Sequence, residues 1–116
     1  MKAGHTPAPG EDRRVDLALA AGGYLRSLDG RVRQIPGLDR IAEETLRQGA
    51  RVRWGTPARG RAGCTYLWRR EIVLAAWLFD HPGDSIRDVW LHELGHCAAG
   101  RDCERARAWQ RDWEGE

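Results

Sequence analysis

Residues 92–96, His-Glu-Leu-Gly-His, constrain what this chain can fold into more than any other part of the sequence. They match the pattern His-Glu-x-x-His, and histidines four residues apart on a helix project from the same face. This spacing brings two imidazoles to one metal ion, with His92 and His96 as candidate ligands. Glu93 is rotated about 100° around the helix from the first histidine, so it lies beside the metal and can act as general base. The motif predicts a zinc site, at which an activated water hydrolyses a peptide bond.

The residues on both sides of the motif predict the helix that its spacing requires. Apolar residues recur there at intervals of three and four. They are Ile86, Val89, Trp90, Leu94 and Cys97. Asp84 or Ser85 is the expected N-cap, and Gly100 is expected to end the helix in a left-handed conformation. A chance match to the motif rarely has such a helix around it, so we prefer a zinc site to two histidines that only pack or face solvent.

A catalytic zinc needs a third protein ligand, and no histidine follows His96. Asp102 is preferred because it falls in helical register with an apolar stripe of the last predicted helix, formed by Ala106, Trp109 and Trp113. The alternative role for Asp102 is to cap that helix. Cys103 is a chemically good ligand that could equally be a buried thiol, and Glu104 could simply interact with the helix dipole.

Length and composition favour one intracellular domain. The chain has 116 residues, of which 41% are hydrophobic, and no apolar run is long enough to cross a membrane. Residues 1–10 form a polar tail that we expect to be disordered, and residues 11–116 form the domain. The tail lacks the apolar core of a secretory signal, and the odd count of three cysteines argues against a disulfide framework. A cytoplasmic location with reduced thiols is therefore expected.

Positive charge is concentrated in the stretch 47–70, which has no acidic residue. Trp54, Tyr66 and Trp68 are interleaved with its arginines, a mixture that can bind phosphates and stack on bases. There are seven arginines: Arg47, Arg51, Arg53, Arg59, Arg61, Arg69 and Arg70. The stretch predicts a nucleic-acid partner, and the alternative is a solvated face of strand edges and a loop.

Hydrophobic periodicity and turn residues predict an α+β domain. The expected order is a helix over 11–28, a helix from Pro36-Gly37 to about Gly49, a strand at 51–54, a loop over 55–63, a hairpin of 64–68 and 71–74, the motif helix, and a final helix that Asp102 opens. The strand nearest the motif helix could hold an extended peptide by backbone hydrogen bonds.

Three segments together resemble the SprT-like zinc metallopeptidases, a zincin family that places a hairpin just before the motif helix. They are Gly63-Cys64-Thr65-Tyr66, Glu71-Ile72-Val73-Leu74 and the motif itself, in roughly the last half of the chain. The resemblance implies a minimal α+β zincin with N-terminal helices, a small antiparallel sheet, an active-site helix and a C-terminal helix. It also implies Zn²⁺ as cofactor and proteolysis, which some members direct at DNA-bound proteins.

The chain departs from that family at the third ligand. SprT-like proteins usually take it from a His-Gly pair with Trp or Phe shortly after, and here Arg105-Ala106 precedes Trp109. An arginine cannot bind zinc. Metzincins, which are also similar, have their third ligand where Asp102 lies but a glycine where this chain has Ala99, and ImmA/IrrE-like proteins use a glutamate from the next helix. Two hypotheses follow: a metallopeptidase that uses Asp102, or a non-catalytic zinc- or DNA-binding module with a degenerate site.

Overall fold

Four helices and five short strands make up residues 13–115, the part of the chain that the computed structural model describes. The predicted tail over 1–10 and the start of the first predicted helix lie outside these residues. The elements are α1 (Leu17–Ala21), β1 (Tyr24–Arg26), β2 (Val32–Gln34), α2 (Leu38–Arg47), β3 (Arg51–Gly55), β4 (Gly63–Tyr66), β5 (Glu71–Ala75), α3 (Gly83–Ala99) and α4 (Cys103–Glu114), with single 3-10 turns at Ala58–Gly60, Leu67–Arg69 and Ala76–Asp80. The predicted α+β class is confirmed.

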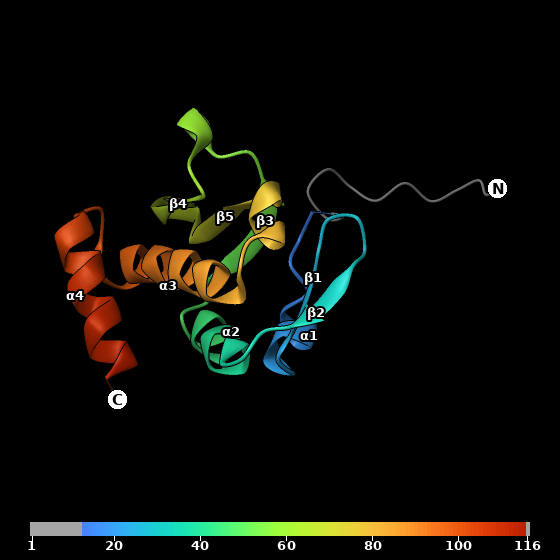
Figure 1. The fold of residues 1–116 in the computed structure, drawn as a ribbon. Coiled ribbons are helices and arrows are strands. Elements are labelled where there is room, and N and C mark those ends of the chain that lie inside the picture. The colour runs from blue at the N-terminus through green and yellow to red at the C-terminus, as the bar shows by residue number, and fades with distance from the viewer. Residues whose placement is uncertain (1–12, 116) are drawn as a thin grey trace.

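The larger sheet is mixed and has the order β3-β5-β4. The expected hairpin is present, because β4 runs antiparallel to β5 with Thr65 opposite Ile72. The expectation of an antiparallel sheet is wrong for β3, which runs parallel to β5. The chain reverses direction after β3 and again after β4, and β5 then inserts between those two strands. β4 and β3 are therefore the two edge strands, and β3 also forms an isolated bridge to Arg14 (Figure 1).

The first predicted helix is wrong over most of its length. Only α1 is helical, and its N-cap is Asp16, which accepts hydrogen bonds from two backbone amides. Gly22 ends the helix, and Gly23 has a φ of 92°, which a continuing helix cannot contain. The next residues pair instead as the β1–β2 hairpin, whose turn includes the expected Asp29-Gly30. Helical spacing in the sequence was thus overridden by two consecutive glycines.

The second predicted helix is confirmed as α2, which follows Pro36-Gly37. It packs against α1 and α3, and α3 in turn lies along β4 and β5 (Figure 1). Trp90 on α3 is fully buried and donates its indole N–H to the Thr45 hydroxyl of α2 over 3.0 Å. This bond satisfies both polar groups inside the core, so it fixes how α3 rotates relative to α2.

α3 carries the motif and begins at Gly83, before either of its expected caps. Its N-cap is Pro82, and neither Asp84 nor Ser85 takes that role, because Asp84 lies inside the first turn and pairs with Arg87. Ile86, Trp90, Leu94 and Cys97 are buried, as their spacing predicts. The helix ends at Gly100, whose φ of 94° is positive as expected, although its ψ of −165° is not that of a left-handed turn.

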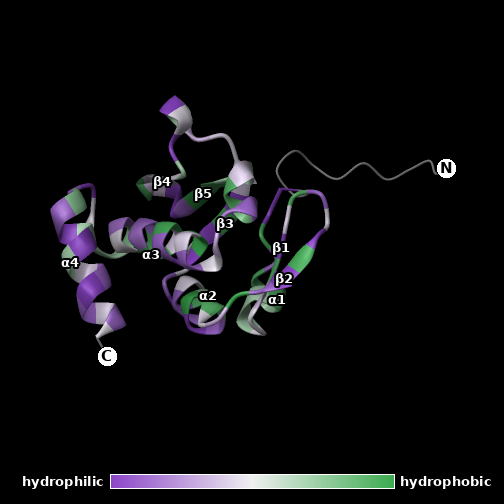
Figure 2. Ribbon diagram, viewed as in Figure 1, coloured by the Kyte–Doolittle hydropathy of each residue, from purple (hydrophilic) through white to green (hydrophobic). Residues whose placement is uncertain are grey.

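α4 crosses α3 at a very short distance, at one end of the fold (Figure 1). A Cβ added to Gly95 would lie only 2.6 Å from the carbonyl oxygen of Ala106. The glycine inside the motif therefore allows the two helices to touch. Figure 2 shows that α4 is mainly hydrophilic, in contrast to the strands of the larger sheet. Among the described residues, no helix is both long and apolar enough to cross a membrane.

Candidate metal centre

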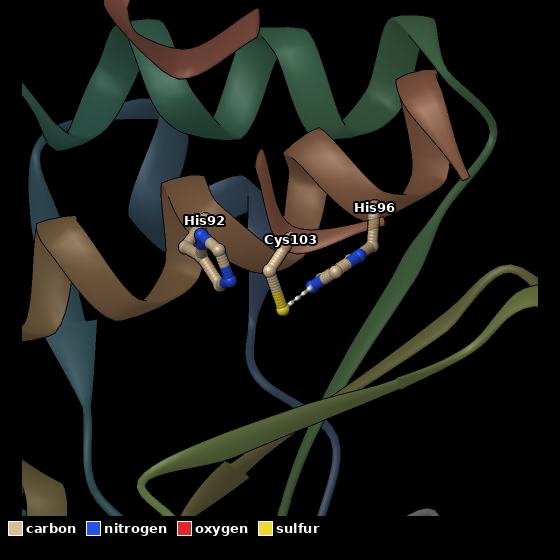
Figure 3. Close-up of side chains that lie close together, drawn as sticks. All are labelled: His92, His96 and Cys103. Atoms are coloured by element: carbon tan, nitrogen blue, oxygen red, sulfur yellow. Dashed lines mark hydrogen bonds between the residues drawn. The ribbon is translucent and has the colours of Figure 1, made fainter. Parts of the chain in front are cut away.

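Three side chains that can bind a metal converge beside α3: His92, His96 and Cys103 (Figure 3). One potential ligand atom from each lies within 4.8 Å of the other two. The two imidazole rings lie side by side, as the four-residue spacing predicts, with centroids 4.7 Å apart. Cys103 is the first residue of α4, and the short connection after Gly100 returns it to the histidines.

Hydrogen bonding determines which nitrogen of His96 can bind a metal. The Nδ1 atom lies 2.8 Å from the carbonyl oxygen of Gly100, so Nδ1 carries the proton and donates it. Nε2 then keeps its lone pair for a metal, and this atom lies 3.8 Å from the Cys103 sulfur. Sulfur and nitrogen ligands of a tetrahedral zinc lie about 3.5 Å apart. The donor set and its spacing therefore fit zinc.

The structure does not bring Asp102 to the histidines. Its side chain instead accepts a hydrogen bond from the backbone N–H of Glu104 over 2.8 Å, which is the N-cap role considered as the alternative. Asp102 does not share the helical register of Ala106 and Trp109, because a cap residue is not helical and Asp102 has an extended ψ of 117°. Glu104 and Arg105 are exposed and line a different pocket. Cys103 is the candidate that the geometry supports.

Glu93 is buried beside the metal-binding group without belonging to it. Only 7% of its surface is exposed, and its Oε1 atom accepts a hydrogen bond from the Thr65 hydroxyl over 2.7 Å. β4 can approach α3 this closely because of Gly63, where an added Cβ would lie 2.8 Å from Val89. Thr65 has no role that its sequence pattern predicts, although Gly63 beside a predicted strand is the kind of signal that marks a close backbone approach.

These groups line one cavity of about 670 Å³. α3 forms its floor, β4 with the preceding Arg61-Ala62 forms one wall, and the α3–α4 connection with α4 forms another. Glu93, both histidines and Cys103 all line it. A substrate in this cavity would meet the metal-binding side chains and the carboxylate together.

Burial affects the titration of several groups at the site. It is the main cause that lowers the pKa of His92, which favours the neutral imidazole that metal binding requires. Burial also raises the pKa values of the Cys64 and Cys97 thiols, so both are protonated at neutral pH. All three cysteines are free, and Cys103 is the exposed one. Cys64 lines the cavity, but its sulfur is not among the three potential ligand atoms that lie within 4.8 Å of one another.

Most arginines of the stretch 47–70 have partners within the chain. Arg53 and Arg69 each lie 3.3 Å from the carboxylate of Glu71. Arg70 donates to a backbone carbonyl of α2's C-cap, and Arg47 pairs with a glutamate of α2. These contacts favour a structural role for four of the seven arginines. Contact with nucleic acid stays a prediction.

Comparisons of this chain with protein-family models, curated proteins and solved structures found no match. A function therefore has to be argued from the chemistry and geometry of the site.

Proposed function

We propose that this chain is a zinc-dependent metallopeptidase of the His-Glu-x-x-His type, a hydrolase with a minimal zincin fold. One observation carries the proposal: three metal-binding side chains meet in a cavity beside a buried carboxylate that is not one of them. Imidazole and thiolate ligands suit zinc and not magnesium or calcium, which prefer oxygen. Zinc bound by three protein ligands would supply one open position for a water and a Lewis acid that polarises the substrate carbonyl.

The side chains of the site then have separate roles. His92, His96 and Cys103 would hold the metal. Glu93 would take a proton from the attacking water and later give it to the leaving amine. Thr65 is a positioning residue, because its hydroxyl donates to Oε1 of this carboxylate and holds it in the cavity. No described residue donates to Oε2, so that oxygen remains available for the proton.

The edge strand beside the cavity supports a peptide as substrate. β4 pairs with β5 on one side only, and its residues Gly63, Cys64 and Thr65 line the cavity. An extended peptide could therefore add to the open side of β4 by backbone hydrogen bonds. Action on DNA-associated proteins belongs to the proposal through the SprT-like resemblance and the arginine-rich stretch. A cytoplasmic location belongs to it through the odd count of three cysteines.

Metal analysis and two substitutions test the proposal. The chain purified without chelator should contain close to one zinc per molecule. Glu93→Gln should keep the zinc but lose most cleavage of casein, whereas His92→Ala should lose both, because only the histidine is a ligand. Less than about a tenth of an equivalent of zinc, with no thermal shift on adding zinc, would contradict the metal site.

The same experiment separates the peptidase from its rival. If the parent binds zinc but cleaves no protein or peptide, the non-catalytic zinc- or DNA-binding module is the better description. If Glu93→Gln cleaves casein as fast as the parent, a peptidase mechanism with this carboxylate as base is wrong.

A further inference from the structure

Three arginines line the cavity of the candidate metal centre: Arg61, Arg101 and Arg107. They come from different parts of the fold, since Arg61 precedes β4, Arg101 lies in the α3–α4 connection and Arg107 lies on α4. All three are exposed, and none forms an ion pair with a described carboxylate. Their guanidinium groups are therefore available to a ligand, unlike those of Arg53 and Arg69.

The acidic groups of the cavity do not neutralise these arginines. Among the described residues that line the cavity, only Asp88 and Glu93 carry carboxylates. Each accepts a hydrogen bond from a neutral side chain: Asp88 from Gln110 over 2.8 Å, and Glu93 from Thr65 over 2.7 Å. Three guanidinium groups thus outnumber two carboxylates that already have partners. A divalent metal with a single thiolate ligand would add to the positive charge.

The arginines lie on different sides of the cavity. Arg61 belongs to the side formed by β4, whereas Arg101 and Arg107 belong to the side formed by α4 and the connection before it.

We infer that this cavity selects acidic peptide segments, with Asp or Glu side chains on both sides of the bond to be cleaved. The inference rests on the proposed function and names its substrate class. A peptide that crosses the cavity along β4 passes Arg61 on one wall and Arg101 and Arg107 on the other. The planar guanidinium fork matches a carboxylate and can donate two parallel hydrogen bonds to it.

A nucleic acid suits this cavity less well than an acidic peptide. Proteins that bind single strands combine a positively charged groove with aromatic side chains on which bases stack. Of the described residues that line the cavity, none is Phe, Tyr or Trp. The exposed Trp68 and Tyr66 do not line it. Charge without a stacking surface favours carboxylates.

Peptide selection by an inactive form of the chain tests the inference. Zinc-loaded Glu93→Gln is immobilised and incubated with a library of random ten-residue peptides, and the retained peptides are sequenced. Asp and Glu should be enriched over Asn and Gln by about three- to ten-fold, since partly exposed ion pairs contribute modestly. Adding Arg61→Gln, Arg101→Gln and Arg107→Gln should abolish the enrichment, and so should high salt. Arg26→Gln is the matched control, because Arg26 is exposed on β1 and does not line the cavity.

The outcomes separate this inference from the proposed function. Equal retention of acidic and amide peptides would overturn the inference, and so would an enrichment that survives the three substitutions. The parent chain is then given the same library, and its cleavage sites are read by mass spectrometry. Cuts without neighbouring Asp or Glu would also overturn it. Arginine-dependent retention without any cleavage would support the selection of acidic segments by this cavity and refute the peptidase proposal.

Discussion

Replacing Gly95 by alanine should disturb both the fold and the metal centre. Gly95 lies in the middle of the motif, where α3 touches α4. An added Cβ would lie 2.6 Å from the Ala106 carbonyl oxygen, whereas ordinary contact begins at 3.4 Å. The three atoms nearest to the added Cβ are the O, Cα and C atoms of Ala106, which belong to the backbone and cannot rotate away. α4 has to move by about 0.8 Å, the difference between these two distances.

Two opposing effects set the size of the change in stability. Alanine inside a helix is favoured over glycine by about 1 kcal/mol. Forcing extra volume into a packed contact costs about 1–3 kcal/mol. We therefore expect Gly95→Ala to lower the free energy of unfolding by about 1 kcal/mol, a fall in Tm of about 4 °C for a domain of this size.

The effect on metal binding should be larger than the effect on stability. Cys103 lies one turn before Ala106 on α4, so it moves with the helix. Metal–ligand distances tolerate deviations of only about 0.2 Å. A displacement of about 0.8 Å should therefore weaken zinc binding by about ten-fold or more, comparable to losing a supporting contact. Competition with a fluorescent zinc chelator measures this affinity, and differential scanning calorimetry measures the Tm of the metal-free chain.

Gly22→Ala is the matched control for this substitution. Gly22 has an ordinary φ of −88°, and its added Cβ would meet a carbonyl oxygen at 3.4 Å. The free energy of unfolding of Gly22→Ala should differ from that of the parent by less than about 0.5 kcal/mol, and its zinc affinity should equal that of the parent. If Gly95→Ala behaves like this control, the close contact of the two helices is wrong. If it loses stability but keeps its zinc affinity, Cys103 is not a ligand.

Three further predictions concern the third ligand, the buried carboxylate and acid stability. Cys103→Ser should weaken zinc binding by about ten-fold or more, whereas Asp102→Ala should chiefly lower the Tm by removing a cap. Chelator competition that ranks the two variants in the opposite order would restore Asp102 as ligand. Thr65→Val should lower kcat by about ten-fold without releasing zinc, because the buried Glu93 carboxylate loses its hydrogen-bond donor. Thr65→Ser, which keeps the hydroxyl, should have the kcat of the parent. An unchanged kcat in Thr65→Val would refute the positioning role. The hydrogen bond from Ser27 is the largest of the causes that lower the pKa of Asp29 to about 2, whereas an Asp side chain in an unfolded chain has a pKa of about 3.9. This carboxylate therefore stabilises the fold above about pH 4 and loses that effect as the pH falls to about 2. An NMR titration should show a higher pKa for Asp29 in Ser27→Ala, and an unchanged value would mean that the hydroxyl is not the cause.

Local patterns predicted the elements in which neighbouring residues decide the conformation. α2 follows Pro36-Gly37 as expected, and the β4–β5 hairpin and the motif helix are where periodicity predicts them. The first predicted helix failed for an equally local reason, since Gly23 adopts a positive φ that ends helical geometry. The parallel pairing of β3 with β5 is different, because nothing in either strand specifies which neighbour it takes.

The pairing of His92 with His96 follows from sequence alone, because four residues make about one turn of any helix. The same periodicity accounts for Glu93 as a neighbour of the metal-binding face. The third donor could not be predicted with the same rule. It lies beyond Gly100, where the chain leaves the helix, and the distance from one helix to the next depends on how closely they pack.

Only the tertiary structure decided between Asp102 and Cys103. The close contact at Gly95 sets the position of α4, and the cap at Asp102 then directs the neighbouring sulfur toward His96. The contact between Thr65 and Glu93 likewise joins residues from a strand and a helix that sequence separates. A repeating backbone geometry relates residues within one element, and that is what the sequence by itself determined. Side chains from different elements meet only where packing brings those elements together, which no local pattern encodes.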